Sequence, residues 1–142
     1  MQGNPPASMQ RITPHLYYED VARALGWLTV AFGLTERLRR SNAQGRVDYG
    51  EMTFGEGVVT MGWPGPGYQT PARLPNATSR LYVYVDDVDE HFRRARAAGA
   101  KIITEPRDQS DGERRYAAED CEGHHWYFAT QVETTGDTGA NE

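Results

Sequence analysis

This sequence has almost no cysteine, no long apolar run and no excess of positive charge. Its 142 residues include one cysteine, Cys121, which excludes a framework of disulfides within the chain and a cysteine-rich zinc site. No apolar run approaches the roughly 20 residues that cross a bilayer as a helix, so we expect no membrane partner. Lys and Arg number 15 against 20 Asp and Glu. This balance argues against a nucleic-acid partner, because phosphate-backbone binding needs a concentrated basic face.

The amino terminus lacks the charged-then-apolar pattern of a signal peptide, so the expected compartment is the cytoplasm. What the sequence does contain is an uneven set of aromatic residues. Eight Tyr and three Trp stand beside four Phe. Most of these rings carry a polar group, which a purely hydrophobic core does not require.

Three stretches have the composition of tails or a linker. Residues 1–10 are polar with a proline pair, and residues 133–142 show no apolar periodicity, so we expect two flexible tails. Residues 64–79 contain four prolines, which remove hydrogen-bond donors and restrict their neighbours. We interpret this stretch as a linker between a first module, residues 11–63, and a second module, residues 80–132.

The two halves repeat one another with a constant offset of 67. The sequence LYYEDV at residues 16–21 aligns with VYVDDV at residues 83–88, and in each copy a short strand leads into an acidic helix start. The first predicted helix buries Val21, Leu25, Leu28 and Phe32 and ends at Gly33. The second starts at a capping box formed by Asp87 and Glu90, buries Val88, Phe92 and Ala95, and ends at Gly99. The order in both halves is strand, helix and three strands, with these last strands expected at 34–40, 46–54, 57–63, 101–104, 114–119 and 124–130.

Alternation along the strands separates an aliphatic face from an aromatic one. Leu81, Val83 and Val85 share the face expected to pack on a helix, whereas Arg80, Tyr82 and Tyr84 share the other. The first and last strands repeat this pattern, with Ile12, Pro14 and Leu16 against Thr13, His15 and Tyr17, and Trp126 and Phe128 against His125 and Tyr127. A concave surface that binds a small molecule accounts for so many polar-tipped rings. The alternative is an interface between modules or subunits, where Tyr and Trp are also enriched.

Three segments give the chain its resemblance to a known family. They are HLYYEDVARALGWLTVAFGL at residues 15–34, LYVYVDDVDEHFRRARAAGAKI at residues 81–102 and AEDCEGHHWYFAT at residues 118–130. The chain resembles the vicinal oxygen chelate superfamily, the group of glyoxalase, bleomycin-resistance protein and extradiol dioxygenase domains, over residues 11–132. The resemblance implies an α+β fold of two βαβββ modules that form a curved mixed sheet with a cup, helices on its outer face and, commonly, a homodimer. Cys121 stands where the family usually has proline.

The resemblance also bears on metal binding. Metal-dependent members place His, Gln or Glu ligands at four strand positions, which in this sequence hold Thr13, Met61, Arg80 and Tyr127. These side chains are poor ligands for a divalent cation, so we predict no metal and no cofactor. A different site remains open, because His15 and His125 lie on the predicted cup face and Glu51 or Glu119 could supply a carboxylate.

These observations favour metal-free binding of a small aromatic or heteroaromatic molecule, of the resistance or sequestration type. The expected ligand-binding residues are His15, Tyr17, Met61, Trp63, Arg80, Tyr82, Tyr84, His125 and Tyr127. The alternative is an enzyme, either a lyase, isomerase or dioxygenase-like protein with a metal at His15 and His125, or a metal-independent one in which either histidine is the general base. A third reading is an interaction module whose cup is filled by protein.

Overall fold

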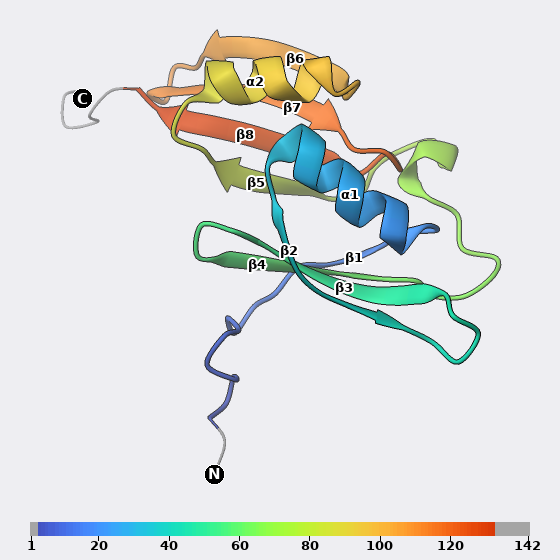
Figure 1. Ribbon diagram of the computed structural model, residues 1–142. Coiled ribbons are helices and arrows are strands. Elements are labelled where there is room, and N and C mark those ends of the chain that lie inside the picture. The colour runs from blue at the N-terminus through green and yellow to red at the C-terminus, as the bar shows by residue number, and fades with distance from the viewer. Residues whose placement is uncertain (1–2, 133–142) are drawn as a thin grey trace. The chain divides into compact units, whose positions relative to one another are not determined.

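The computed structural model describes residues 3–132 and divides into two compact units, Met1–Thr70 and Pro71–Glu142 (Figure 1). Within the described residues, each unit contains one four-stranded mixed sheet and one α-helix. The prediction of an α+β chain built from two βαβββ modules is confirmed. Neither α-helix in this part of the chain is long and apolar enough to cross a membrane.

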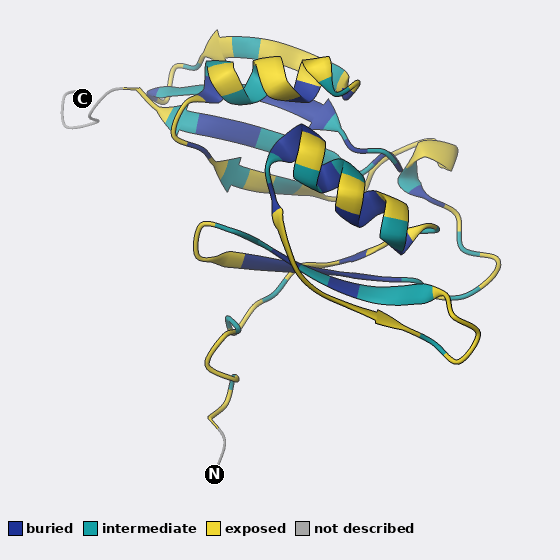
Figure 2. Cartoon of the chain, viewed as in Figure 1, coloured by how far each residue is buried: buried dark blue, intermediate teal, exposed yellow. Residues whose placement is uncertain are grey.

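The sheet of the first unit has a short parallel pair of strands at one edge. Strand β1 (His15–Tyr17) leads into helix α1 (Val21–Phe32), which is followed by β2 (Thr35–Ser41), β3 (Val47–Phe54) and β4 (Gly57–Gly62). The strand order is β1-β4-β3-β2, with β1 parallel to β4 and the other neighbours antiparallel. Helix α1 contacts β2 and β3, while β2 itself is exposed along its whole length (Figure 2).

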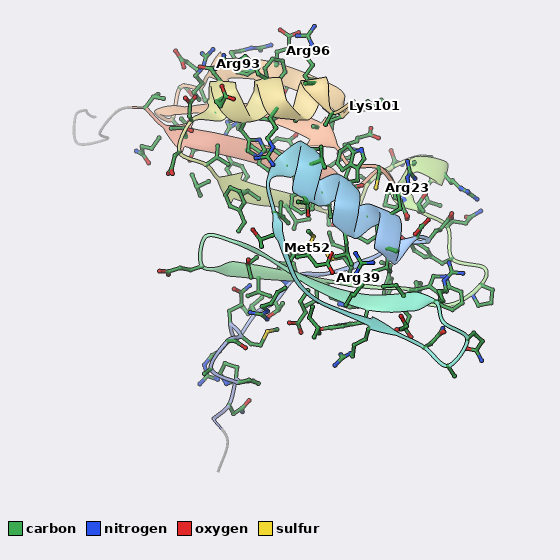
Figure 3. All side chains as sticks on the ribbon, viewed as in Figure 1. Arg23, Arg39, Met52, Arg93, Arg96 and Lys101 are labelled. Atoms are coloured by element: carbon green, nitrogen blue, oxygen red, sulfur yellow. The ribbon has the colours of Figure 1, made fainter. Side chains whose placement is uncertain are left out.

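The second unit repeats this arrangement. A short 3₁₀ helix, η1 (Pro71–Arg73), precedes β5 (Arg80–Tyr84), α2 (Val88–Ala97), β6 (Lys101–Asp108), β7 (Glu113–Glu119) and β8 (His125–Gln131). The strand order is β5-β8-β7-β6, and β5 runs parallel to β8. Helix α2 contacts β6, β7 and β8. Arg93 and Arg96 of this helix, both labelled in Figure 3, are exposed.

The helix boundaries follow from their caps. Asp20 accepts a hydrogen bond from the Arg23 backbone N–H, and Asp87 accepts one from the Glu90 backbone N–H, each at a distance typical of an N-cap. These two N-cap residues are again 67 positions apart, so the repeat seen in the sequence is also present in the structure. Helix α1 ends before Gly33, whose φ of 81° is the left-handed conformation that glycine adopts without strain.

The apolar face of α1 is buried as predicted, since Val21, Leu25, Leu28 and Phe32 are all buried. In α2, Val88 and Ala95 are buried as predicted, whereas Phe92 is only half-buried. Ile12 departs from the expectation of an apolar strand face, because β1 begins only at His15 and the Ile12 side chain is 87% exposed.

The division between the units falls inside the predicted linker, residues 64–79. The part of this stretch that belongs to the second unit is bonded within it, since the Ala72 backbone N–H donates to the Glu122 carbonyl at 3.2 Å. The module boundaries and the flexible tails stay predictions. Gln10 exchanges two hydrogen bonds with the Val58 backbone, at 2.9 and 3.1 Å, and residues 133–142 lie outside the described part of the chain.

Candidate functional site

The second unit contains a hollow on the face of its sheet that bears the tyrosines. Its volume is about 360 Å³. Register places Tyr82 of β5 directly beside Tyr127 of β8, and Arg80 beside His125. The lining residues, which we call the tyrosine hollow, are Arg80, Tyr82, Thr104, Glu105, Arg107, Gln109, Arg115 and Tyr127.

Stacked rings form part of this hollow. The rings of Tyr82 and Tyr127 are 6.0 Å apart and inclined by 26°. The guanidinium of Arg80 lies 4.4 Å from the centroid of the Tyr127 ring, within the range of a cation–π interaction. The predicted residues Arg80, Tyr82 and Tyr127 are therefore brought together, and they offer both a flat apolar surface and directional donors.

Glu113 fixes the hydroxyl groups of Tyr82 and Tyr84, the two tyrosines of β5. Its two carboxylate oxygens accept hydrogen bonds from the hydroxyls of Tyr82, at 2.6 Å, and Tyr84, at 2.7 Å. Arg115 donates to both Glu113 and the Tyr82 hydroxyl. Burial and the Glu113 bond raise the pKa of Tyr82, while Arg115 opposes this shift. Tyr82 therefore presents a neutral, fixed ring at neutral pH. Tyr84 is 61% exposed and does not line the tyrosine hollow.

A second hollow adjoins the first and is lined in part by the last residues of the predicted linker. It measures about 470 Å³ and shares Arg80 and Tyr127 with the tyrosine hollow. Its other lining residues are Asn76, Ala77, Thr78, Ser79 and His125. The predicted residue His125 thus lies beside Tyr127, and its Nε2 atom is 3.7 Å from a Glu119 carboxylate oxygen.

The first unit gathers a different polar cluster around His15. Its Nδ1 atom lies 2.6 Å from the Thr60 hydroxyl, and its ring stacks on Tyr49 at 6.3 Å. Tyr49 in turn donates to Glu51 at 2.8 Å. Burial lowers the pKa of His15, so the folded protein favours its neutral imidazole.

Met61 is not on this face. It pairs with Leu16 of β1, and its side chain is 0% exposed within the core. Thr60 is the β4 residue whose side chain reaches His15, so Met61 lies on the opposite face of β4. We therefore leave Met61 out of the candidate site.

The remaining predicted residues of the first unit lie apart from any described hollow. Tyr17 is half-exposed and makes edge contacts with His15 and Tyr68. Trp63 follows β4, and the guanidinium of Arg46 covers one face of its ring at 3.9 Å. Their roles in ligand binding stay predictions.

The four family metal positions do not form a ligand set. Thr13 precedes β1 and donates its hydroxyl to the Gln10 carbonyl, Met61 is buried, and Arg80 covers Tyr127. Across residues 3–132, no three His, Cys, Asp or Glu side chains gather closely enough to hold a metal ion. His15 and His125 belong to different units, and a joint role for them stays a prediction.

Sequence reasoning missed several side chains. Glu105 and Arg107 of β6, and Gln109 just after it, line the tyrosine hollow. The burial of β6 shows no clear alternation that would have indicated them. Arg115 also lines this hollow, whereas its neighbour Arg114 does not. His91 of α2 is half-buried, with Nδ1 2.6 Å from the Tyr116 hydroxyl and its ring 4.2 Å from that of Phe128.

Comparison with known proteins agrees with this architecture. Residues 9–128 match the family described as the glyoxalase/bleomycin resistance protein/dioxygenase superfamily. The chain is 30% identical over 126 residues to the uncharacterized protein Rv0887c of Mycobacterium tuberculosis, covering 85% of this chain and 74% of the relative.

Solved structures show the same fold. The crystal structure of TioX from Micromonospora sp. ML1 is similar at 35% identity and a TM-score of 0.71, covering 85% of this chain and 98% of that one. The fosfomycin resistance protein FosX from Mesorhizobium loti shares the fold at 15% identity and a TM-score of 0.61, covering 89% and 93% of the two chains. The chain belongs to the glyoxalase/bleomycin resistance protein/dioxygenase superfamily.

Proposed function

We propose that this protein binds a small planar aromatic or heteroaromatic molecule in the tyrosine hollow, as a resistance or sequestration protein does. The observation that carries the proposal is the stacked pair Tyr82 and Tyr127 with Arg80 packed against it. A ring that stacks on tyrosine gains apolar contact, and offset or edge geometry adds about 0.5–1.5 kcal/mol per aromatic pair.

Three features support this proposal. The volume of about 360 Å³ falls within the usual range of small-molecule sites, roughly 300–1,000 Å³. Polar groups converge on the apolar surface, as Arg80 and Arg115 do here. The Glu113 carboxylate fixes Tyr82 before any ligand arrives, which lowers the entropic cost of binding.

Sequestration requires affinity and no turnover, so side-chain contacts of this kind are sufficient for it. The family name includes bleomycin resistance, and one structural neighbour is named as a fosfomycin resistance protein. Membership of this family supports a role in binding small molecules.

Thermal denaturation in the presence of bicyclic aromatic compounds tests the proposal. The matched probes are naphthalene derivatives and their fully saturated analogues, and the matched variants are Tyr127→Leu, within the hollow, and Tyr84→Leu, outside it. Planar compounds should raise the melting temperature of the wild type and of Tyr84→Leu, but not that of Tyr127→Leu. A ligand at a hundred times its Kd adds about 2.7 kcal/mol of stability. Equal shifts in all three proteins, or no shift with any compound, would contradict the proposal.

Self-association is a separate proposal that rests on the family resemblance. We propose a homodimer located in the cytoplasm. Light scattering coupled to size exclusion should give twice the chain mass of 15.9 kDa. A mass of one chain at all concentrations would exclude the dimer.

A further inference from the structure

Two arginines face each other directly in the sheet of the second unit. Arg107 of β6 is the cross-strand partner of Arg115 of β7, and both line the tyrosine hollow. Like charges placed directly opposite one another destabilise an antiparallel pair. The pair therefore lowers the stability of the ligand-free protein unless nearby negative charges offset the repulsion.

One of these two charges is already compensated. Arg115 lies 3.2 Å from a Glu113 carboxylate oxygen and 3.5 Å from an Asp111 oxygen. Arg107 and Arg80 differ from it, because neither forms an ion pair with any residue in the range 3–132. Arg80 instead lies on the ring of Tyr127, where its guanidinium keeps its hydrogen-bond donors available.

Charge balance indicates what the hollow would accept. The charged residues that line the hollow are Arg80, Arg107, Arg115 and Glu105. The two carboxylates that pair with Arg115 do not line it, so three guanidiniums face the hollow with a single carboxylate. A negatively charged ligand would be attracted to these guanidiniums, whereas a cationic ligand would add to the repulsion between Arg107 and Arg115.

We infer that the tyrosine hollow takes a planar aromatic carboxylate, whose rings lie against Tyr82 and Tyr127 and whose carboxylate binds the guanidiniums of Arg80 and Arg107. This inference rests on the proposed function and specifies its ligand class. Guanidinium is suited to the role, because its planar array of donors matches a carboxylate and remains charged at every physiological pH. The net negative charge of the whole chain does not decide the matter, since the local charges of the hollow act at contact distance.

Isothermal titration with two matched probes tests the inference. The anionic probe is 2-naphthoate and the neutral probe is naphthalene-2-carboxamide, which has the same rings and nearly the same shape. The variants are Arg107→Gln, within the hollow, and Arg93→Gln, which removes the same charge from the exposed side of α2. The wild type should bind 2-naphthoate at least about tenfold more tightly than the carboxamide, because hydrogen bonds to charged groups are the stronger ones.

The substitutions should then separate charge from ring contact. Arg107→Gln should weaken naphthoate binding by about tenfold and leave carboxamide binding unchanged, while Arg93→Gln should alter neither. Arg107→Gln also relieves the like-charge pair, so its melting temperature without ligand should equal or exceed that of the wild type and verify that it folds. Equal wild-type affinities for the two probes, or equal losses of both in Arg107→Gln, would overturn the inference and leave the proposed function standing. Failure of both probes to bind the wild type would overturn both.

Discussion

Gly62 leaves the space in which the His15 imidazole lies. A Cβ atom at position 62 would approach the His15 Nε2 atom to 2.7 Å, closer than real side chains come. The ring lies over β4 in this position and keeps its Nδ1 atom 2.6 Å from the Thr60 hydroxyl. The placement of His15 therefore depends on the absence of a side chain on the strand beside it.

Gly62→Ala should displace His15 and break its hydrogen bond to Thr60. We expect a loss of about 1 kcal/mol in the free energy of unfolding, the usual net value of one hydrogen bond, because the exposed His15 ring can move aside. Urea denaturation measures it. Gly26→Ala is the control, because a Cβ there meets nothing within 4 Å. That substitution should stabilise α1 by up to about 1 kcal/mol. Equal effects of the two substitutions would contradict this account of Gly62.

Gly123 plays a comparable part where the linker meets the second unit. Its φ is +93°, and a Cβ atom would lie 2.7 Å from Cα of Ala72. Gly123→Ala should therefore both strain the backbone and displace η1, and we expect a loss of more than about 2 kcal/mol.

Gly99→Ala isolates the backbone strain from the steric contact. Gly99 has the same φ of +93°, yet nothing lies within 4 Å of a Cβ built there. It should show the cost of backbone strain alone, about 1 kcal/mol. If the two variants unfold at the same urea concentration, contact with Ala72 is not what requires Gly123.

His15 should make stability depend on pH. Burial lowers its pKa below the usual 6.5, so the unfolded chain binds more protons than the folded one just below that pH. The stability contributed by neutral His15 is complete above 6.5 and is lost as the pH falls through the folded pKa. The effect should stay below about 1 kcal/mol, because the ring is partly exposed.

The measurement compares the wild type with His15→Gln in urea between about pH 7.5 and pH 5. The stability difference, wild type minus variant, should decrease as the pH is lowered. A difference that does not change with pH, or that increases on acidification, would contradict the sign of the shift.

Tyr116 should stabilise the second unit through its hydroxyl. The side chain is fully buried, burial raises its pKa, and its hydroxyl lies 2.6 Å from His91 Nδ1. Tyr116→Phe should cost about 1 kcal/mol, the usual net value of a hydrogen bond. Tyr127→Phe, in the half-exposed hollow, should change stability by less than about 0.5 kcal/mol. Equal losses would mean that the bond to His91 contributes nothing.

Sequence patterns predicted the modules well because helix caps and apolar spacing are local. Asp20 and Asp87 cap their helices as the 67-residue offset requires. The face on which Met61 lies could not be predicted, because β4 is buried on both faces and its Val58, Val59 and Met61 show no alternation that could fix the register.

The polar contacts of the site could not be predicted in the same way. The Glu113 carboxylate accepts a hydrogen bond from Tyr82, which is 31 positions away in the sequence. Arg107 lies opposite Arg115 only because the pairing of β6 with β7 shifts its register. Such contacts depend on register between strands, which composition and spacing do not specify.

The most direct test of the central claim is a nuclear magnetic resonance titration of protein with isotope-labelled tyrosine rings, using 2-naphthoate as the ligand. Single Tyr→Phe variants assign the ring signals. If the second unit binds a planar aromatic ligand as proposed, the signals of Tyr82 and Tyr127 move on titration, while that of Tyr49 in the first unit stays in place. Saturating naphthoate that leaves both Tyr82 and Tyr127 unmoved would contradict the account.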